Sequence, residues 1–264
     1  MDNVKALVLK AAGTNCDEET ANAFKLAGAE PRILHMNMLY RKKDSLENYQ
    51  ILAIPGGFSY GDAISAAVIW ANELKYKLRV DLRKFVDQGK PVIGICNGFQ
   101  VLVKAGLLPA FEQTLEPQSV TLAFNDIGLY FDTWVHLKVN DRSPCVFTQT
   151  LNQPLYLPSA HAEGKFMADK KILSELEEKN QIVLNYIDPD GVKAGFPWNP
   201  NGSLENVAGI CNPDGNVFGL MPHPERYMHR YMHPRWTSMI GLEEKGDGYM
   251  IFRNAVEFAE KRFS

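Results

Sequence analysis

The sequence predicts an α/β fold, a doubly wound and mostly parallel β-sheet flanked by helices. Short apolar segments rich in β-branched residues, typical of strands buried on both faces, alternate with segments of helical periodicity in the N-terminal half. A turn bounded by glycines then joins one of these strands to a helix at Cys96. Because ligands bind beyond the carboxyl ends of parallel strands, we expect the functional site in the loops that follow them.

The N-terminal half supplies the alternating elements. Runs of β-branched residues predict strands, and apolar residues spaced three or four apart predict helices. Gly28 predicts the end of the first helix. The patterns place strands at 6–9, 31–35, 50–54 and 91–95, and helices at 18–27, 66–74 and 82–88 and from Phe99 onward.

The C-terminal half is richer in predicted strands. Alternating polarity indicates strands between 119 and 139, and a Pro213-Asp-Gly turn indicates a hairpin. Asn201-Gly202 predicts a tight turn within a loop at 195–203. The remaining patterns predict strands at 154–157, 181–186, 207–211 and 216–221, and helices at 170–178 and 249–262.

Length and charge narrow the class of function. The chain has 264 residues, enough for one large α/β domain and short for two, so we expect a single domain over 1–264. The formal net charge of −3 provides no polybasic field for nucleic acid or an anionic membrane. We therefore expect a small-molecule substrate, with no nucleic-acid or membrane partner.

The four cysteines indicate a reducing compartment. They are widely spaced and form neither CxxC pairs nor a disulfide framework. The N-terminus leads directly into a predicted strand, and no apolar run reaches membrane-spanning length, so we expect a cytoplasmic protein. Cys145 and Cys211 are expected to be structural. Cys16 precedes a helix and could be a reactive thiol there, but we favour a loop-packing role.

Cys96 is the candidate nucleophile. Gly94 and Gly98, two residues away on each side, let the chain reverse closely and hold Cys96 in a strained conformation with its sulfur exposed. The helix N-terminus beyond it favours the thiolate over the thiol. The alternative is that Cys96 is a small buried apolar residue, and the flanking glycines argue against it.

His223 and Glu225 are the candidate base and its partner. A cysteine nucleophile needs a base to take and return its proton, and that base needs a group that fixes its tautomer. Prolines on both sides of His223 stiffen the segment, and in an extended chain residues two apart face the same side. A second His-x-Glu pair, His161 and Glu163, competes for this role, and the residues alone do not decide between them. The alternative is that the segment is a proline-rich surface loop whose histidine has no catalytic role.

Gly57 and Asn97 are the candidate oxyanion-hole donors. Gly57 follows a buried strand, where paired glycines let backbone N–H groups approach a developing negative charge, and Asn97 directly follows the nucleophile. The loop lacks the spacing of a P-loop or a dinucleotide site. We also predict no metal site, because His229 and His233 share helical spacing without an HExxH motif and are better explained as a solvated or interfacial pair.

Three motifs carry a family resemblance. They are PGGFSYGD at 55–62, GICNGFQ at 94–100 and MPHPER at 221–226. Together they resemble the class I, triad-type glutamine amidotransferases, which have a flavodoxin-like fold. The residues of these motifs are most similar to those of the glutaminase subunits of phosphoribosylformylglycinamidine synthase, and the resemblance covers nearly the whole chain. Further matches are GTNCDEE at 13–19, AHAEGKF at 160–166 and NPNGS at 199–203.

The resemblance implies a function and a set of roles. Cys96, His223 and Glu225 match the family triad, which hydrolyses the side-chain amide of glutamine through a thioester. Gly56 and Gln100 are assigned to substrate binding, Gln100 because it lies four residues after the nucleophile. In the family, the ammonia passes to a synthetase subunit that makes the amidine of purine biosynthesis, often with a small accessory subunit. No cofactor is implied in this chain, and ATP and Mg²⁺ are expected only on the synthetase.

Other functions remain to be weighed. Related cysteine-elbow proteins act as deglycases, proteases or chaperone-like proteins, but they do not normally carry an MPHPER-type segment. A non-catalytic regulatory subunit would not need the complete triad, and an amidotransferase of another pathway fits the motif wording less well. The chain departs from the family at Leu129 and Thr133, where arginines are usual, and at 227–236, an extension for which we expect a partner-facing or loop-closing role.

Overall fold

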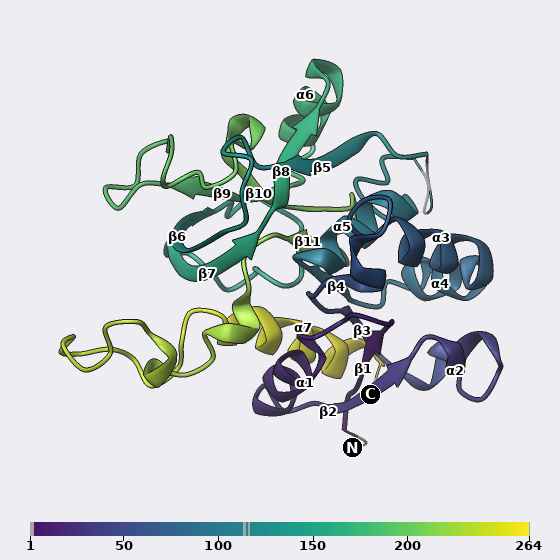
Figure 1. Ribbon diagram of the computed structural model, residues 1–264. Helices are drawn as coiled ribbons and strands as arrows, with labels where there is room; N and C mark the ends of the chain where they lie inside the picture. The colour runs from purple at the N-terminus through teal and green to yellow at the C-terminus, as the bar shows by residue number, and fades with distance from the viewer. Residues whose placement is uncertain (1–2, 113–114, 116, 264) are drawn as a thin grey trace.

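A central β-sheet organises the protein (Figure 1). In this computed structural model, which describes residues 3–112, 115 and 117–263, the sheet has nine strands in the order β2-β1-β3-β4-β11-β10-β9-β6-β7. Its strands are β1 (Lys5–Lys10), β2 (Glu30–His35), β3 (Ile51–Ile54), β4 (Val92–Ile95), β6 (Phe131–Val139), β7 (Leu155–His161), β9 (Ile182–Ile187), β10 (Val207–Cys211) and β11 (Val217–Leu220). The expected domain span of 1–264 thus includes positions outside the described residues.

Half of the sheet is parallel and covered by helices on both faces. Strands β2, β1, β3, β4 and β11 pair in parallel, and every residue of β3 and β4 is buried. Helices α3, α4 and α5 lie on one face, and α1 and α7 lie on the other (Figure 1). The helices are α1 (Asp17–Leu26), α2 (Asn37–Tyr40), α3 (Val68–Lys77), α4 (Arg79–Asp87), α5 (Asn97–Ala105), α6 (Lys170–Glu178) and α7 (Tyr249–Phe263). The doubly wound parallel core is as predicted. None of the helices in the described ranges has the length and apolar character needed to cross a bilayer.

The predicted hairpin in the C-terminal half determines where the site forms. Strands β10 and β11 are antiparallel neighbours, but β11 also pairs in parallel with β4, with Leu220 opposite Ile95. The two strands therefore end side by side, and the residues after them meet. The backbone N–H of Cys96 donates to the carbonyl of Leu220 at 2.8 Å, which continues this pairing into the turn.

The other half of the sheet is antiparallel and differs in detail from the prediction. The alternating segment 119–139 is divided between two sheets: β6 joins the main sheet, whereas β5 (Val120–Phe124) pairs with β8 (Glu163–Ala168) in a separate two-stranded sheet. Strand β8 was not predicted. The break comes at Asn125, whose side chain donates to the carbonyls of Leu129 and His161 and draws the chain into a tight loop.

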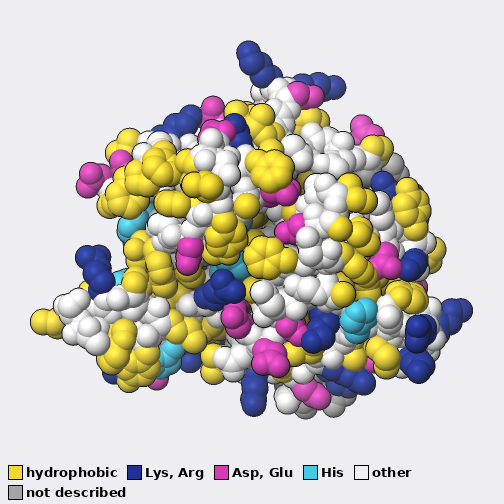
Figure 2. Space-filling view, in the orientation of Figure 1, with side chains coloured by type: hydrophobic (Ala, Val, Ile, Leu, Met, Phe, Trp, Pro, Cys, Tyr) yellow, Lys and Arg dark blue, Asp and Glu magenta, His cyan; other side chains and the backbone are white. Residues whose placement is uncertain are grey.

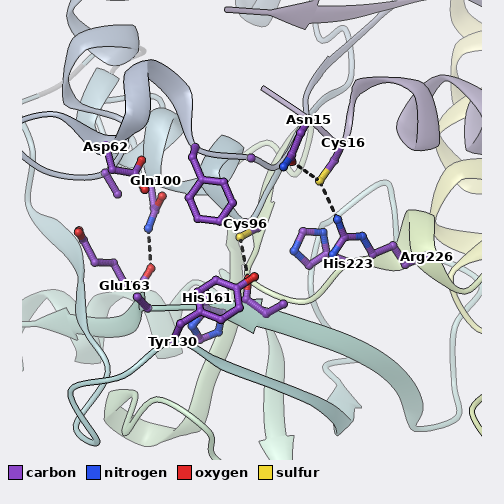
Figure 3. Close-up of a pocket in the computed structure, with 15 residues that line it drawn as sticks. Asn15, Cys16, Asp62, Cys96, Gln100, Tyr130, His161, Glu163, His223 and Arg226 are labelled. Carbon is purple, nitrogen blue, oxygen red and sulfur yellow. Dashed lines mark hydrogen bonds between the residues drawn. The ribbon is translucent and has the colours of Figure 1, made fainter. Parts of the chain in front are cut away.

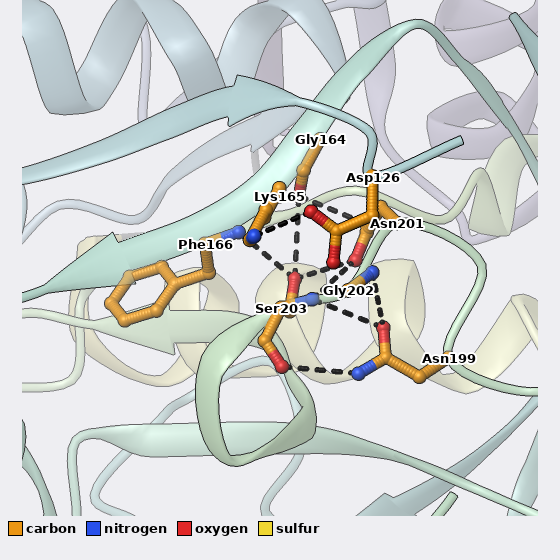
Figure 4. A network of polar contacts seen from close by, with 8 residues as sticks. All are labelled: Asp126, Gly164, Lys165, Phe166, Asn199, Asn201, Gly202 and Ser203. Atoms are coloured by element: carbon orange, nitrogen blue, oxygen red, sulfur yellow. Dashed lines mark hydrogen bonds and ion pairs between the residues drawn. The ribbon is translucent and has the colours of Figure 1, made fainter. Parts of the chain in front are cut away.

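A network of polar contacts fixes the predicted 195–203 loop against β8 (Figure 4). The Asn199 carboxamide oxygen accepts from the N–H groups of Gly202 and Ser203, and Asn201 donates to the Gly164 carbonyl at 2.9 Å. The Ser203 hydroxyl accepts from the N–H of Phe166. Gly202 has φ +80°, as the predicted Asn-Gly turn requires. Because these groups are buried, the network satisfies them and holds the strand that carries Glu163 in place.

The 227–236 segment extends away from the sheet as a mostly irregular loop (Figure 1). Its base is anchored by His233, which is only 5% exposed and lies against the rings of Trp134, Tyr156 and Tyr227. Of the expected solvated or interfacial roles, the solvated one is therefore wrong for His233, and the interfacial one stays a prediction. The shared helical face is also wrong, because only a short 3₁₀ turn, Arg230–Met232, separates His229 from His233.

We expect Gly98→Ala to destabilise the protein severely. A Cβ at this position would lie 1.8 Å from the Ile54 carbonyl oxygen, so helix α5 could not pack against β3 without moving. The expected loss of unfolding free energy is about 3 kcal/mol, the upper end of the usual cost of overpacking, measured by chemical denaturation. Gly195→Ala is the matched control, since a Cβ there meets open space. Equal stability of the two variants would contradict the tight α5–β3 contact.

Candidate active site

Cys96 occupies the strained turn that the sequence predicted. It lies between β4 and α5 with φ 51° and ψ −106°, a conformation that costs a non-glycine residue free energy and persists only where its surroundings enforce it. Close packing at Gly94 and Gly98 enforces it here. The side chain is 7% exposed and its sulfur lies 3.7 Å from the Ala160 carbonyl oxygen. The nucleophile candidate is thus held at the edge of a pocket.

His223 and Glu225 form the expected pair. The His223 Nδ1 and the Glu225 Oε1 are 2.6 Å apart, and both side chains are buried. The His223 N–H donates to the Pro158 carbonyl, which ties this segment to β7. The local structure differs from the extended chain that we expected, because Glu225 lies in a 3₁₀ turn, Pro224–Arg226, that brings its carboxylate back to the imidazole.

The second ring nitrogen of His223 faces the pocket. Nε2 is buried and has no hydrogen-bond partner within the described residues, and the ring lies next to Cys96 (Figure 3). Burial lowers the pKa of His223, but the charge of Glu225 and the adjacent Cys96 and Cys16 sulfurs outweigh it and raise this pKa well above its ordinary value. An imidazolium stabilises negative charge on a nearby sulfur and can later release its proton.

His161, the competing histidine, lies in the same pocket with different partners. Its ring nitrogens contact the side-chain amides of Asn125, at 3.1 Å, and Asn201, at 3.5 Å. Burial and the nearby charge of His223 lower the pKa of His161 to about 3, so its ring is neutral. The structure therefore pairs a carboxylate with His223 and amides with His161, a distinction that the two similar motifs did not reveal.

The expected oxyanion-hole residues flank the nucleophile. Gly57 lines the pocket with φ +143°, and a Cβ there would lie 2.7 Å from the Asn15 backbone nitrogen. Asn97 is the first residue of α5, where backbone N–H groups have no intrahelical acceptor. Its side chain accepts from the N–H of Ser59 and donates to Gln100 at 2.9 Å. The glycine loop and the helix terminus thus meet beside Cys96.

Gly56 and Gln100, the expected substrate contacts, have clear packing roles. A Cβ on Gly56 would lie 2.9 Å from the His223 ring and 3.5 Å from the Cys96 Cβ, so only glycine lets the two side chains face each other here. The Gln100 carboxamide accepts from Asn97 and donates to the Glu163 carbonyl. Gln100 therefore links the start of β8 to α5, the helix that directly follows the nucleophile.

Cys16, for which a loop-packing role is expected, is buried in the loop before α1 and also lines the pocket. Its sulfur accepts from the Arg226 guanidinium at 3.1 Å, and a Cβ on Gly56 would lie 3.2 Å from this sulfur, on the side of His223. The position of Cys16 at the N-terminus of a helix indicated a possible reactive thiol. Nothing in the sequence indicated that Cys16 and Cys96, which are far apart in the chain, line the same pocket. Cys145 and Cys211 are fully buried and lie outside the pocket lining.

The pocket has a volume of about 110 Å³. Cys16, His223 and Glu225 form the one group of described residues whose donor atoms, all within 4.8 Å of one another, are arranged as metal ligands can be. The contacts argue against a metal cation there. The positively charged Arg226 guanidinium already donates to the Cys16 sulfur, and His223 Nδ1 and Glu225 Oε1 are hydrogen-bonded to each other.

Comparisons with known proteins identify the family. Residues 3–259 match the CobB/CobQ-like glutamine amidotransferase domain. The chain is 45% identical to phosphoribosylformylglycinamidine synthase subunit PurQ of Dehalococcoides mccartyi, over 99% of this chain and 100% of the relative. It is 41% identical to the Archaeoglobus fulgidus subunit PurQ, over 98% of each chain. The chain belongs to the PurQ family of glutamine amidotransferases.

A solved structure supports the same assignment. A chain in the structure of PurLQS from Thermotoga maritima superposes with a TM-score of 0.74 at 29% identity, covering 97% of this chain and 99% of that chain. More distant amidotransferases share the fold alone, among them the glutaminase domain of Trypanosoma brucei CTPS, at 13% identity and a TM-score of 0.55. The predicted fold and family resemblance to PurQ are thus confirmed.

The two pocket histidines should titrate differently. At neutral pH we expect His223 to be protonated, because its raised pKa keeps the proton bound above the ordinary range, and His161 to be neutral, because its pKa of about 3 lies far below. Histidine ring NMR measures both states, with His223→Gln and His161→Gln variants to assign the signals. Glu225→Gln should lower the His223 pKa. A neutral His223 beside a protonated His161 would reverse the roles.

Proposed function

We propose that this chain is a single-domain glutaminase subunit that hydrolyses the side-chain amide of glutamine and delivers ammonia to a synthetase partner. The observation that carries the proposal is the strained Cys96 facing a buried His223 whose other nitrogen is held by Glu225 at 2.6 Å. This is the arrangement that thiol-based amide hydrolysis requires. The product would be phosphoribosylformylglycinamidine, made on the synthetase in purine biosynthesis.

The reaction has two stages. In the first, the Cys96 sulfur attacks the amide carbon while His223 donates its Nε2 proton to the leaving nitrogen, which departs as ammonia and leaves a γ-glutamyl thioester on Cys96. In the second, His223 takes a proton from water, whose oxygen attacks the thioester, and the Cys96 thiolate leaves as glutamate is released, which restores the thiolate beside a protonated His223. Glu225 holds the imidazole in the required tautomer throughout.

Backbone donors stabilise the negative charge on the oxygen of each tetrahedral intermediate. Gly57, from the loop after β3, and Asn97, from the start of α5, supply them in this proposal. The two segments meet beside the nucleophile, where the Ser59 N–H donates to the Asn97 side chain, and buried contacts hold them, so the donors are aligned before the substrate binds. Such a donor contributes about 10²–10³ in turnover.

The partner performs the chemistry that needs ATP. We propose that ATP and Mg²⁺ bind only to the synthetase subunit, that a small accessory subunit completes the complex, and that the complex acts in the cytoplasm. The Thermotoga maritima protein of similar structure bears the composite name PurLQS, which supports an assembly of this kind. A deglycase, protease or chaperone of similar fold is disfavoured, because full-length relatives at more than 40% identity carry the PurQ name.

Replacing the nucleophile should separate two activities of the assembled enzyme. We expect Cys96→Ala to abolish glutamine-dependent formation of the amidine while ammonia-dependent formation continues, because the synthetase reaction does not use the thiol. The rates are measured with the purified subunits, ATP and either nitrogen source. Cys145→Ala, a buried cysteine outside the pocket, is the control and should retain both activities. Loss of both activities in Cys96→Ala would contradict this division of labour.

The isolated chain should be a weak glutaminase. We expect its turnover to rise when the synthetase binds, because hydrolysis that waits for partner closure prevents the release of unused ammonia. Glutamate production is compared for the chain alone and with its partner. Full turnover without the partner would contradict this coupling.

A further inference from the structure

The active-site pocket has two chemically different ends (Figure 3). Cys96 lies near the middle. On one side are Cys16, His223 and Arg226, and on the other are the acidic side chains of Asp62 and Glu163. The mechanism proposed above uses the first end and the middle, and it leaves both acidic side chains without a role.

At the end of the pocket beyond His223, the charged Arg226 side chain already has partners within the protein. The Arg226 guanidinium contacts the Glu19 carboxylate at 2.9 Å and the Cys16 sulfur at 3.1 Å. Its charge is therefore balanced within the protein, and burial of the imidazole closes this side. A substrate whose amide lies at Cys96 extends toward the opposite end.

Asp62 presents an unsatisfied oxygen at that opposite end. Its Oδ1 is buried without a hydrogen-bond partner in the part of the chain that the structure describes. Burial raises the pKa of Asp62 and the charge of Glu163 adds to this, while the Ala67 N–H and Lys104 offset part of the shift. A buried carboxylate oxygen without a donor is costly, so a ligand donor there would be strongly favoured.

Glu163 is held beside Asp62 by the nucleophile helix. Gln100, itself 4% exposed, donates to the Glu163 carbonyl, and this fixes the start of β8 relative to α5. Lys104 lies one turn further along α5, and its positive charge interacts electrostatically with both carboxylates. Its Nζ donates to the Ser65 hydroxyl at 3.3 Å. Two carboxylates and one ammonium leave one uncompensated negative charge, which a single cationic group would balance.

We propose that Asp62 and Glu163 bind the α-ammonium group of glutamine and so select an amino-acid amide over other amides. The inference rests on the proposed function, and it extends the substrate from the amide at Cys96, past Gln100, to the acidic end. The α-ammonium would donate to the unpartnered Asp62 Oδ1 and to the Glu163 carboxylate. A charge-assisted contact of this kind accounts for about 10- to 100-fold in affinity.

Equilibrium binding tests this without requiring turnover. The probes are glutamine and glutaramate, which has the same amide and carboxylate but lacks the α-ammonium. They are titrated by calorimetry into the Cys96→Ala chain in complex with its synthetase partner, alone and with Asp62→Asn or Glu163→Gln added. Asparagine tolerates the positive φ of 52° at position 62, and both changes keep the side-chain shape. Asp132→Asn, an exposed acid of β6 outside the pocket lining, controls for long-range charge.

The expected result is a selective loss. Asp62→Asn and Glu163→Gln should weaken glutamine binding by about 10- to 100-fold and leave glutaramate binding unchanged or stronger, whereas Asp132→Asn should alter neither. Equal weakening of both ligands, or undiminished glutamine binding, would overturn the assignment. Failure of the proposed function looks different: the wild-type complex would then release no glutamate from glutamine, whatever the acidic residues bind.

Discussion

The parallel pairing of β4 with β11 is the constraint on which the site depends. It sets Leu220 opposite Ile95 and continues through the hydrogen bond from Cys96 to Leu220, so two segments far apart in the sequence end at one place. The nucleophile then follows one strand and the His223 segment follows the other. The close approach of Gly98 to Ile54 adds the third component, because it brings the Gly57 loop to the same edge.

Different hydrogen-bond partners give two similarly buried histidines different chemistry. His223 has a carboxylate partner and is cationic, whereas His161 has amide partners and is neutral, although both are buried in one pocket. The polar network around Asn199 and Ser203 serves the site indirectly, since it fixes β8 and hence the strand start that carries Glu163. Much of the polar interior thus orients a small number of reactive groups.

Local patterns explain how much of this could be predicted from the sequence. The Cys96 turn and the His223–Glu225 pair depend on residues close together in the chain, so glycine spacing and the flanking prolines marked them as candidates, although the choice of His223 over His161 came from the family resemblance. The role of Cys16 depends on a contact with Arg226 across the fold, and the pairing of β8 with β5 depends on the Asn125 loop. Contacts of that kind leave no periodic signal in the sequence.

The most direct test of the account is to find which thiol reacts with a glutamine-like electrophile. The chain, with its synthetase partner, is incubated with 6-diazo-5-oxo-norleucine, and the modified residue is located by mass spectrometry with and without competing glutamine. We predict a single adduct on Cys96 that glutamine blocks and that His223→Ala slows. Modification of Cys16 in its place, or no adduct at all, would contradict the assignment of Cys96 as the nucleophile.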